Sequence, residues 1–188
     1  MTAPTRVAGW GEAADGSVVT WTVAEGRKGR RWREVVARGA STVHALLLET
    51  DPDARFSHLE LARADGLWTF HPEADGTLHG NQVRAGDLDV RHVRGWPFDA
   101  DDAVIVEDSP ISLAAIAWRH ESGLVAGSAV VVAGVFIGAD GELERLPTIA
   151  VERLSSGRWR VGEGTPFEID ATGLPVLAGG QQRALEQT

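Results

Sequence analysis

Residues 108–120 read DSPISLAAIAWRH, and this stretch decides the fold that the sequence predicts. Ser109 is a residue of the kind that caps a helix, and Pro110 suits the first helical position because its missing N–H needs no partner there. Isoleucine, leucine and alanine dominate the following run, and Arg119 and His120 then place cationic groups at the negative end of the helix dipole. The stretch predicts a helix from Pro110 to about His120.

Apolar side chains occupy almost every side of this predicted helix. Ile111, Ala115 and Trp118 lie on one side, and residues such as Ile116 leave little of the remaining surface polar. A helix that is apolar nearly all round is buried nearly all round. Because the rest of the chain reads as strands, we expect a mostly-β (α+β) fold in which a single highly curved antiparallel sheet wraps around one central helix near residues 110–121.

Tight turns and alternating segments predict the strands. Asp-Gly or Ser-Gly pairs, which are typical of turns, recur along the chain. Between such turns, apolar and polar residues alternate as they do in strands with one buried and one wet face. These alternating segments are residues 17–23, 56–62, 88–93, 103–106, 148–151 and 167–169.

Two further segments, Val43–Leu48 and Ala129–Ile137, are apolar on both faces, so we expect them to be covered on both sides. The chain has 188 residues, which suits one domain with a sizeable core. We expect a single domain over residues 1–188 with an ordered core at about residues 17–178 and frayed ends.

Composition excludes several classes of function. The chain has no cysteine, which excludes disulfides, zinc–thiolate sites and cysteine nucleophiles. The first residues, MTAPTR, lack the apolar core of a secretory signal, so we expect a cytoplasmic protein. The longest apolar stretch, Leu124–Ile137, is shorter than the ~20 residues that cross a bilayer, so no stable membrane insertion is expected.

The charge of the chain bears on its partners. A net charge of −9 argues against nucleic acid as a partner, because phosphate backbones attract clustered lysine and arginine. One basic cluster, Arg27-Lys28-Gly29-Arg30-Arg31, stands against this acidic background. We interpret it as a solvated loop that leads into a strand.

Histidines are the first candidates for chemistry. His58 and His71 are each followed two residues later by a glutamate, and His79 and His92 fall on neighbouring predicted strands. The spacing matches no metal-binding signature, and no nucleophile elbow is present. We therefore expect no metal, no cofactor and no catalytic residue. A small hydrolase or isomerase that uses His58, His71 or His92 with a carboxylate is the last-ranked alternative.

Seven tryptophans and no tyrosine make the aromatic residues a second group of candidates. Most of the tryptophans fall in predicted strands or the helix, where they suit a core, whereas Trp10 and Trp96 fall in predicted loops. A cavity lined by indole and aliphatic groups could accept an acyl chain or the face of a sugar. The candidates for such a ligand pocket are Trp21, Trp68, Trp96, Phe98, Ile111, Ala115, Trp118 and Trp159.

Short segments follow one another in a set order over about residues 17–185. They are Leu59-Glu60-Leu61, Asp65-Gly66-Leu67-Trp68-Thr69, Leu88-Asp89-Val90, Pro97-Phe98, Val151-Glu152-Arg153-Leu154, Arg158-Trp159-Arg160-Val161 and Phe167-Glu168-Ile169-Asp170. Their order resembles that of a family of glycolipid-binding proteins whose fold is a spiral β-roll. The chain departs from the family at residues 109–113, SPISL, and at residues 176–179, VLAG.

The resemblance implies a sheet wrapped around one helix, related in fold to bacterial lipoprotein-carrier proteins whose concave sheets hold acyl chains. We therefore expect a non-enzymatic binding protein for an apolar, lipid-like or glycolipid-like ligand, held in a pocket between the curved sheet and the central helix. The alternative from another class is a protein-interaction or dimerisation module without a ligand cavity. In that case Val43–Leu48 would lie at a sheet edge and pair with a second copy, so the protein is expected to be a monomer or a homodimer.

Overall fold

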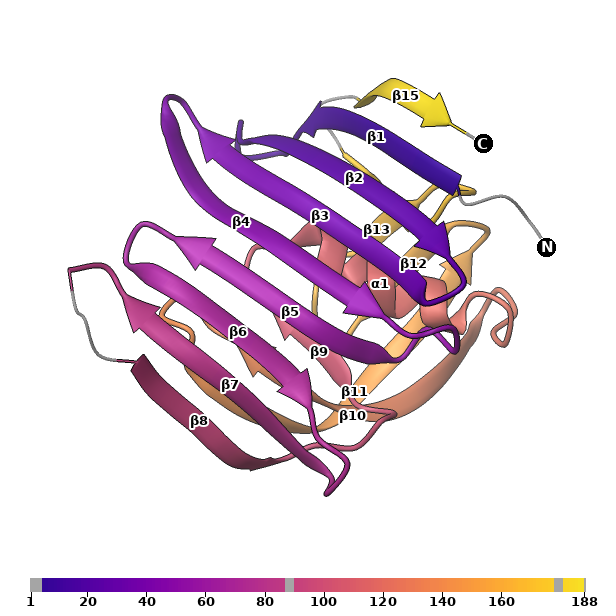
Figure 1. Ribbon diagram of the computed structural model, residues 1–188. Helices are drawn as coiled ribbons and strands as arrows, with labels where there is room; N and C mark the ends of the chain where they lie inside the picture. The colour runs from indigo at the N-terminus through magenta and orange to yellow at the C-terminus, as the bar shows by residue number, and fades with distance from the viewer. Residues whose placement is uncertain (1–4, 87–89, 178–180, 188) are drawn as a thin grey trace. The chain divides into compact units, whose positions relative to one another are not determined.

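The computed structural model describes residues 5–86, 90–177 and 181–187 (Figure 1). The chain divides into two compact units. Unit 1 comprises residues 1–100 and 177–188, and unit 2 comprises residues 101–176. Each unit is described by itself below, and the expectation of a single domain stays a prediction.

Unit 1 is a nine-stranded antiparallel sheet. Its strands follow the order β15-β1-β2-β3-β4-β5-β6-β7-β8, so neighbours along the chain are also neighbours in the sheet except where the last strand returns beside the first (Figure 1). The strands are β1 (Thr5–Glu12), β2 (Val18–Gly26), β3 (Gly29–Arg38), β4 (Ser41–Thr50), β5 (Phe56–Arg63), β6 (Gly66–Pro72), β7 (Thr77–Arg84), β8 (Val90–Pro97) and β15 (Gln181–Gln187).

The first and the last strand of the described residues both belong to this sheet. β1 and β15 lie outside residues 17–178, where we expected the ordered core, and they pair with each other in an antiparallel ladder. Trp10 and Trp96 therefore lie in strands rather than in the loops that we expected. Of the alternating segment 88–93, residues 88 and 89 lie outside the described residues.

The nine-stranded sheet has a buried face, called the inner face here, and a more exposed outer face. On β4 the inner positions His44, Leu46 and Leu48 are buried, while the outer positions are only half-buried. The expectation that Val43–Leu48 is covered on both sides is therefore wrong. The outer-face Leu47 pairs across the sheet with Arg33 and Glu60, polar neighbours that leave this face open to water.

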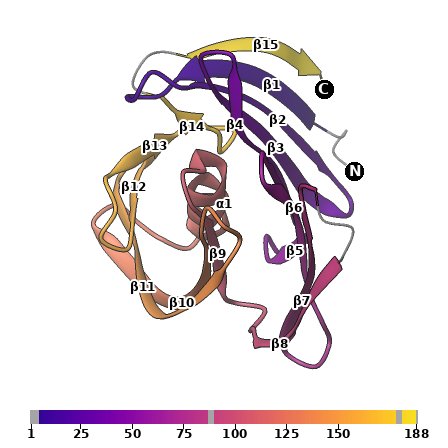
Figure 2. The same cartoon turned by 90° about the vertical axis from the view of Figure 1, so that its left-hand side faces the viewer.

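Unit 2 is a six-stranded sheet with one helix. The strand order is β14-β13-β12-β11-β10-β9, and the helix connects the parallel neighbours β9 and β10 while every other pairing is antiparallel. The helix contacts β9, β11 and β14 of its own unit (Figure 2). The elements are β9 (Ala103–Val106), α1 (Pro110–His120), β10 (Ser128–Ile137), β11 (Leu143–Ser155), β12 (Arg158–Val161), β13 (Phe167–Ile169) and β14 (Pro175–Val176).

The helix lies where the sequence predicts it. The Ser109 hydroxyl accepts a hydrogen bond from the Ser112 amide at 3.1 Å, so Ser109 is the N-cap, and the helix runs from Pro110 to His120. Every residue of α1 is buried or half-buried, as its all-round apolar pattern predicts. By contrast, Val131 of β10 is 65% exposed, so the expectation that Ala129–Ile137 is covered on both faces is wrong.

The fold class is confirmed as mostly β with one helix in the described residues. The strands form two curled sheets rather than the single sheet that we expected, because β8 and β9 do not pair and the ladder breaks between them. That a sheet wraps around the helix stays a prediction. Within the described part of the chain, no helix combines the length and the apolar character that crossing a bilayer requires.

Candidate functional site

Two buried ionisable side chains meet on the inner face of the unit 1 sheet. Nε2 of His44 lies 2.8 Å from Oε1 of Glu34, and both side chains are buried. Glu34 of β3 pairs with Leu46 of β4, and His44 lies two residues before Leu46 on the same face. The two side chains therefore meet diagonally across neighbouring strands, where alternation turns both inward.

Two tryptophans surround this pair in the register of the sheet. Trp21 of β2 lies directly opposite Glu34, and Trp32 lies two residues before Glu34 on the same inner face. We call Trp21, Trp32, Glu34 and His44 the Glu34–His44 cluster. All four side chains are buried.

Three polar atoms of the cluster are buried without a hydrogen-bond partner among the described residues. They are Nε1 of Trp21, Nε1 of Trp32 and Nδ1 of His44. Trp68 on the same face differs, because the Gln82 side chain, oriented with its oxygen toward β6, accepts from its indole N–H at 3.0 Å. Buried polar groups in native proteins nearly always have partners, so these three atoms make the cluster a candidate binding site for a ligand or an ordered water.

The cluster suits a particular kind of partner. An indole N–H can only donate a hydrogen bond. When a neutral imidazole donates through Nε2 to a carboxylate, its Nδ1 can only accept. A hydroxyl group both accepts and donates, so hydroxyl oxygens on a ligand could satisfy the tryptophans and His44 together.

The sequence contains a signal for this cluster that no motif carries. In β3, residues Trp32, Glu34 and Val36 share one face, so Glu34 stands at an inward position between two apolar residues. In the same way His44 leads the inward series that continues with Leu46. A titratable residue at a buried position of an alternating strand is therefore the sequence signal for both Glu34 and His44.

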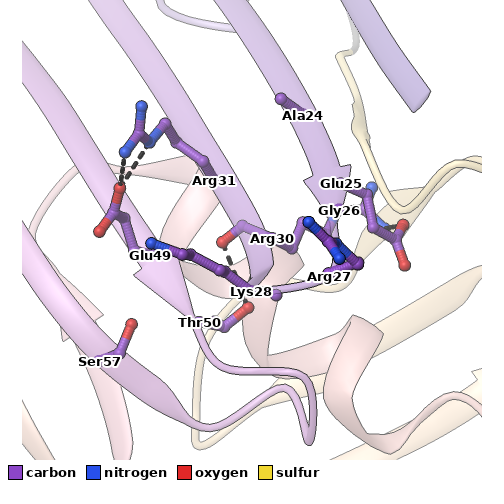
Figure 3. A pocket seen from close by; sticks show the side chains of 11 residues that line it. Ala24, Glu25, Gly26, Arg27, Lys28, Arg30, Arg31, Glu49, Thr50 and Ser57 are labelled. Carbon is purple, nitrogen blue, oxygen red and sulfur yellow. Dashed lines mark hydrogen bonds and ion pairs between the residues drawn. The ribbon is translucent and has the colours of Figure 1, made fainter. Parts of the chain in front are cut away.

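A second candidate site is a pocket of about 580 Å³ at the end of the β2–β3 hairpin (Figure 3). We call it the rim pocket. The hairpin forms one wall, and residues at the end of β4 and the start of β5 form the other. The lining residues are Ala24, Glu25, Gly26, Arg27, Lys28, Gly29, Arg30, Arg31, Glu49, Thr50 and Ser57.

The basic cluster of the sequence is thus part of a pocket. Arg27 and Lys28 are exposed and form the turn, in agreement with the expected solvated loop. Arg30 is only 6% exposed, which corrects that expectation. Its guanidinium carbon lies 4.1 Å from the centre of the Trp32 ring, so the inward register of β3 places the charge over an indole face.

The residues predicted to line a ligand pocket divide between the two units. Trp21, Trp68, Trp96 and Phe98 belong to unit 1. All of these but the half-buried Trp96 are buried, and Phe98 packs edge-on against Phe56 with ring centres 5.7 Å apart. The unit 2 residues are Ile111, Ala115, Trp118 and Trp159. A pocket between sheet and helix stays a prediction.

Trp159 of unit 2 resembles the unit 1 tryptophans in one respect. Its ring is fully buried, and its Nε1 lacks a partner among the residues described. The guanidinium of Arg153 lies over the ring, with its central carbon 5.4 Å from the ring centre.

The histidines predicted as alternative catalytic groups lie on the outer face of unit 1. His58 pairs with Glu60 at 3.1 Å, His71 pairs with Glu73 at 3.0 Å, and His92 pairs with Asn81 at 2.7 Å. The side chains of His58 and His71 are 30% and 42% exposed. Within residues 5–86, 90–177 and 181–187, no three histidine or acidic side chains are arranged to hold a metal ion.

The outer face also carries a row of apolar residues. Val35, Ala45, Ala62, Leu67 and Val83 follow one another directly in the register of β3 to β7. A hollow of about 220 Å³ lies over part of this row. Because the paired residues lie side by side, the row is continuous across the sheet.

Across the described residues, these features define a mostly-β protein with one helix, a buried polar cluster and a charged rim pocket. No protein-family model and no curated protein matches the chain. A crystal structure of a DUF1089 family protein from Pseudomonas aeruginosa is similar to it, with a TM-score of 0.53 and 18% sequence identity. The similarity covers 84% of this chain and 87% of that one, and at this identity it establishes the fold alone. The resemblance to glycolipid-binding proteins stays a prediction.

Proposed function

We propose that the protein is a non-enzymatic binding protein for a lipid-like ligand that carries hydroxyl groups, with the hydroxyl oxygens held at the Glu34–His44 cluster. The observation that carries the proposal is the set of buried, unpartnered atoms in the described residues: two indole N–H groups and one imidazole nitrogen. The resemblance to glycolipid-binding proteins supports the same class of ligand. The binding is proposed to take place in the cytoplasm, the compartment expected from the sequence.

The energetics favour an occupant at the cluster. A buried donor or acceptor without a partner costs about 1–3 kcal/mol. Three such atoms on neighbouring residues of the sheet therefore lower the free energy of unfolding until hydrogen-bonding groups reach them. A ligand that supplies those groups recovers the cost on binding, which adds to its affinity.

The surroundings of the cluster explain why the rest of the ligand should be apolar. Side chains next to the cluster in the sheet register are aliphatic and at most 6% exposed. They are Val19, Val23, Val36, Leu46 and Leu48. Burying alkyl groups against such side chains contributes about 25 cal/mol for each Å² of apolar surface removed from water.

Extraction of the purified protein tests the proposal first. Native mass spectrometry is applied to the intact purified protein, and organic solvent is used to extract a second sample. In both we expect a co-purifying amphiphile of defined mass. The extracted protein is then titrated by calorimetry with a monoacylglycerol and a long-chain alkyl glucoside, both of which carry hydroxyl groups.

Matched variants identify the site. Trp21→Phe and Trp32→Phe each remove one indole N–H and keep an aromatic ring, so we expect a loss of affinity of about tenfold, the equivalent of one hydrogen bond of ~1.4 kcal/mol. Trp68→Phe is the control, because its indole already has Gln82 as a partner. An extracted protein that binds neither probe, or equal losses in all three variants, would contradict the proposal.

A further inference from the structure

We propose that the rim pocket is a binding site for an anionic phosphate group. This inference goes beyond the proposed function, and none of the residues that line the rim pocket belongs to the Glu34–His44 cluster. The phosphate could be carried by a free metabolite or by a lipid headgroup, and the experiment below separates these sources.

The rim pocket contains more cationic than anionic side chains. Its cations are the two turn residues Arg27 and Lys28 and the two β3 residues Arg30 and Arg31. Its carboxylates are Glu25 and Glu49, so the pocket carries a formal charge of +2, which is four cations minus two carboxylates, on a chain whose net charge is −9.

The two carboxylates already have partners. Glu49 pairs with Arg31 across β3 and β4 (Figure 3). Oε2 of Glu25 lies 3.5 Å from Nη1 of Arg30. Arg27 and Lys28, by contrast, have no acidic partner within the part of the chain that the structure describes.

The hairpin that carries these two cations packs closely on β4. Gly29 has a φ of +112°, and a Cβ at this position would lie 1.9 Å from the carbonyl oxygen of Thr50. The hairpin backbone therefore packs directly on the end of β4, an approach that only glycine permits. The exposed turn with Arg27 and Lys28 therefore lies beside the pocket.

The lining of the pocket also includes a cation that is held in place, Arg30, and the hydroxyl-bearing Ser57. Arg30 is buried to more than nine-tenths and is held between Glu25 and the ring of Trp32. Of the two hydroxyl-bearing residues in the lining, Thr50 already donates to the carbonyl oxygen of Arg30 at 3.4 Å (Figure 3). The hydroxyl group of Ser57 remains as a donor. Guanidinium, ammonium and hydroxyl groups are the side-chain donors that bind phosphate oxygens.

The size of the pocket indicates an organic phosphate rather than the inorganic ion. A volume of about 580 Å³ falls within the ~300–1,000 Å³ that is common for small-molecule sites. Glu25 and Glu49 would repel a second anionic group, so we expect one phosphate with a neutral, polar remainder.

Calorimetry with glycerol 3-phosphate, and flotation with vesicles of neutral phospholipid with and without phosphatidic acid, test the site. We expect the wild-type protein to bind one or both of the phosphate probes, with an affinity that falls as salt is added. Binding to glycerol 3-phosphate alone would assign the pocket to a free metabolite. Binding to phosphatidic acid vesicles alone would assign it to a lipid headgroup.

The double variant Arg27→Gln/Lys28→Gln shows whether the rim pocket is responsible. It removes both unpaired cations from an exposed turn, so the fold should persist, and we expect at least an about tenfold loss of binding. The control is Arg33→Gln/Arg158→Gln, which makes the same change in net charge at exposed sites that do not line the pocket. Binding of neither probe, or equal losses in both double variants, would overturn the inference.

Discussion

Gly173 shows how a single position can hold two segments of unit 2 together. Its φ is +75°, and a Cβ there would lie 2.4 Å from Cε3 of Trp118. The carboxylate of Asp170 accepts hydrogen bonds from the amides of Thr172 and Leu174 at 2.8 and 3.1 Å. This turn therefore places the backbone of Gly173 directly on the indole of the helix.

We expect Gly173→Ala to destabilise the protein by about 2–4 kcal/mol, because it adds both an unfavourable backbone conformation and a clash with Trp118. Gly16→Ala is the matched control, since Gly16 has a similar φ of +80° with nothing within 4 Å of its Cβ position. Urea unfolding of both variants gives the comparison. Equal losses of stability would mean that the contact with Trp118 contributes nothing.

At the scale of the element, α1 is secured at both ends within its own unit. Ser109 caps its first turn, and Nη1 of Arg153 donates to the carbonyl oxygens of Glu121 and Leu124 just beyond its last turn, at 2.8 and 2.6 Å. Arg119 forms an ion pair with Asp101. His120 occupies the same last turn and is half-buried.

Burial lowers the pKa of His120 below its ordinary value of 6.5, and the neighbouring Arg119 lowers it further, while Asp101 acts in the opposite direction. Below about pH 6.5 the unfolded chain therefore binds a proton at His120 that the folded chain does not, so stability falls as the pH decreases through this range. We expect His120→Gln to lose less stability than the wild-type protein between about pH 7.5 and about pH 5.

Urea unfolding of both proteins across this pH range measures the difference. The variant carries no titrating group at position 120, so any difference in slope belongs to His120. Parallel curves for the two proteins would contradict the expected role of burial at this histidine.

At the scale of the whole molecule, the chain crosses from unit 1 into unit 2 and returns. Its last strand, β15, pairs with β1, the first strand of the same sheet. Without β15, the free edge of the nine-stranded sheet would be β1 itself. An unpaired strand edge is a template for pairing with another chain.

We expect removal of residues 177–188 to lower the melting temperature and to cause self-association that increases with concentration. A second variant replaces Gln181–Gln187 with a glycine–serine segment. It keeps the length of the chain and removes the strand-forming residues, so it separates the loss of the strand from the loss of chain length. Both variants should behave alike in thermal melts and light scattering. A truncated protein that stays monomeric with an unchanged melting temperature would show that β15 does not stabilise the sheet.

The order of the sheet also bears on the dimerisation alternative. β4, which carries Val43–Leu48, lies between β3 and β5, so it offers no edge to a second copy. The choice between monomer and homodimer stays a prediction.

Local signals in the sequence determined the helix, several of the strands and the mostly-β class, but not the terminal strands β1 and β15. A serine cap before Pro110 defines the helix start, and alternation over a few residues defines strands such as Ala103–Val106, whose bounds agree with the structure. Such signals suffice because they depend on neighbours within one turn or one strand. They contain no information about which distant strands pair.

Tertiary structure alone decided the remaining features. The division into two sheets, the pairing of β1 with β15 and the meeting of Glu34 with His44 all depend on strand register. A shift of one residue would turn Glu34 to the opposite face, and one sequence does not specify that choice. For the same reason the sequence showed Arg27–Arg31 as a charged loop, whereas packing of Gly29 on Thr50 made it the wall of a pocket.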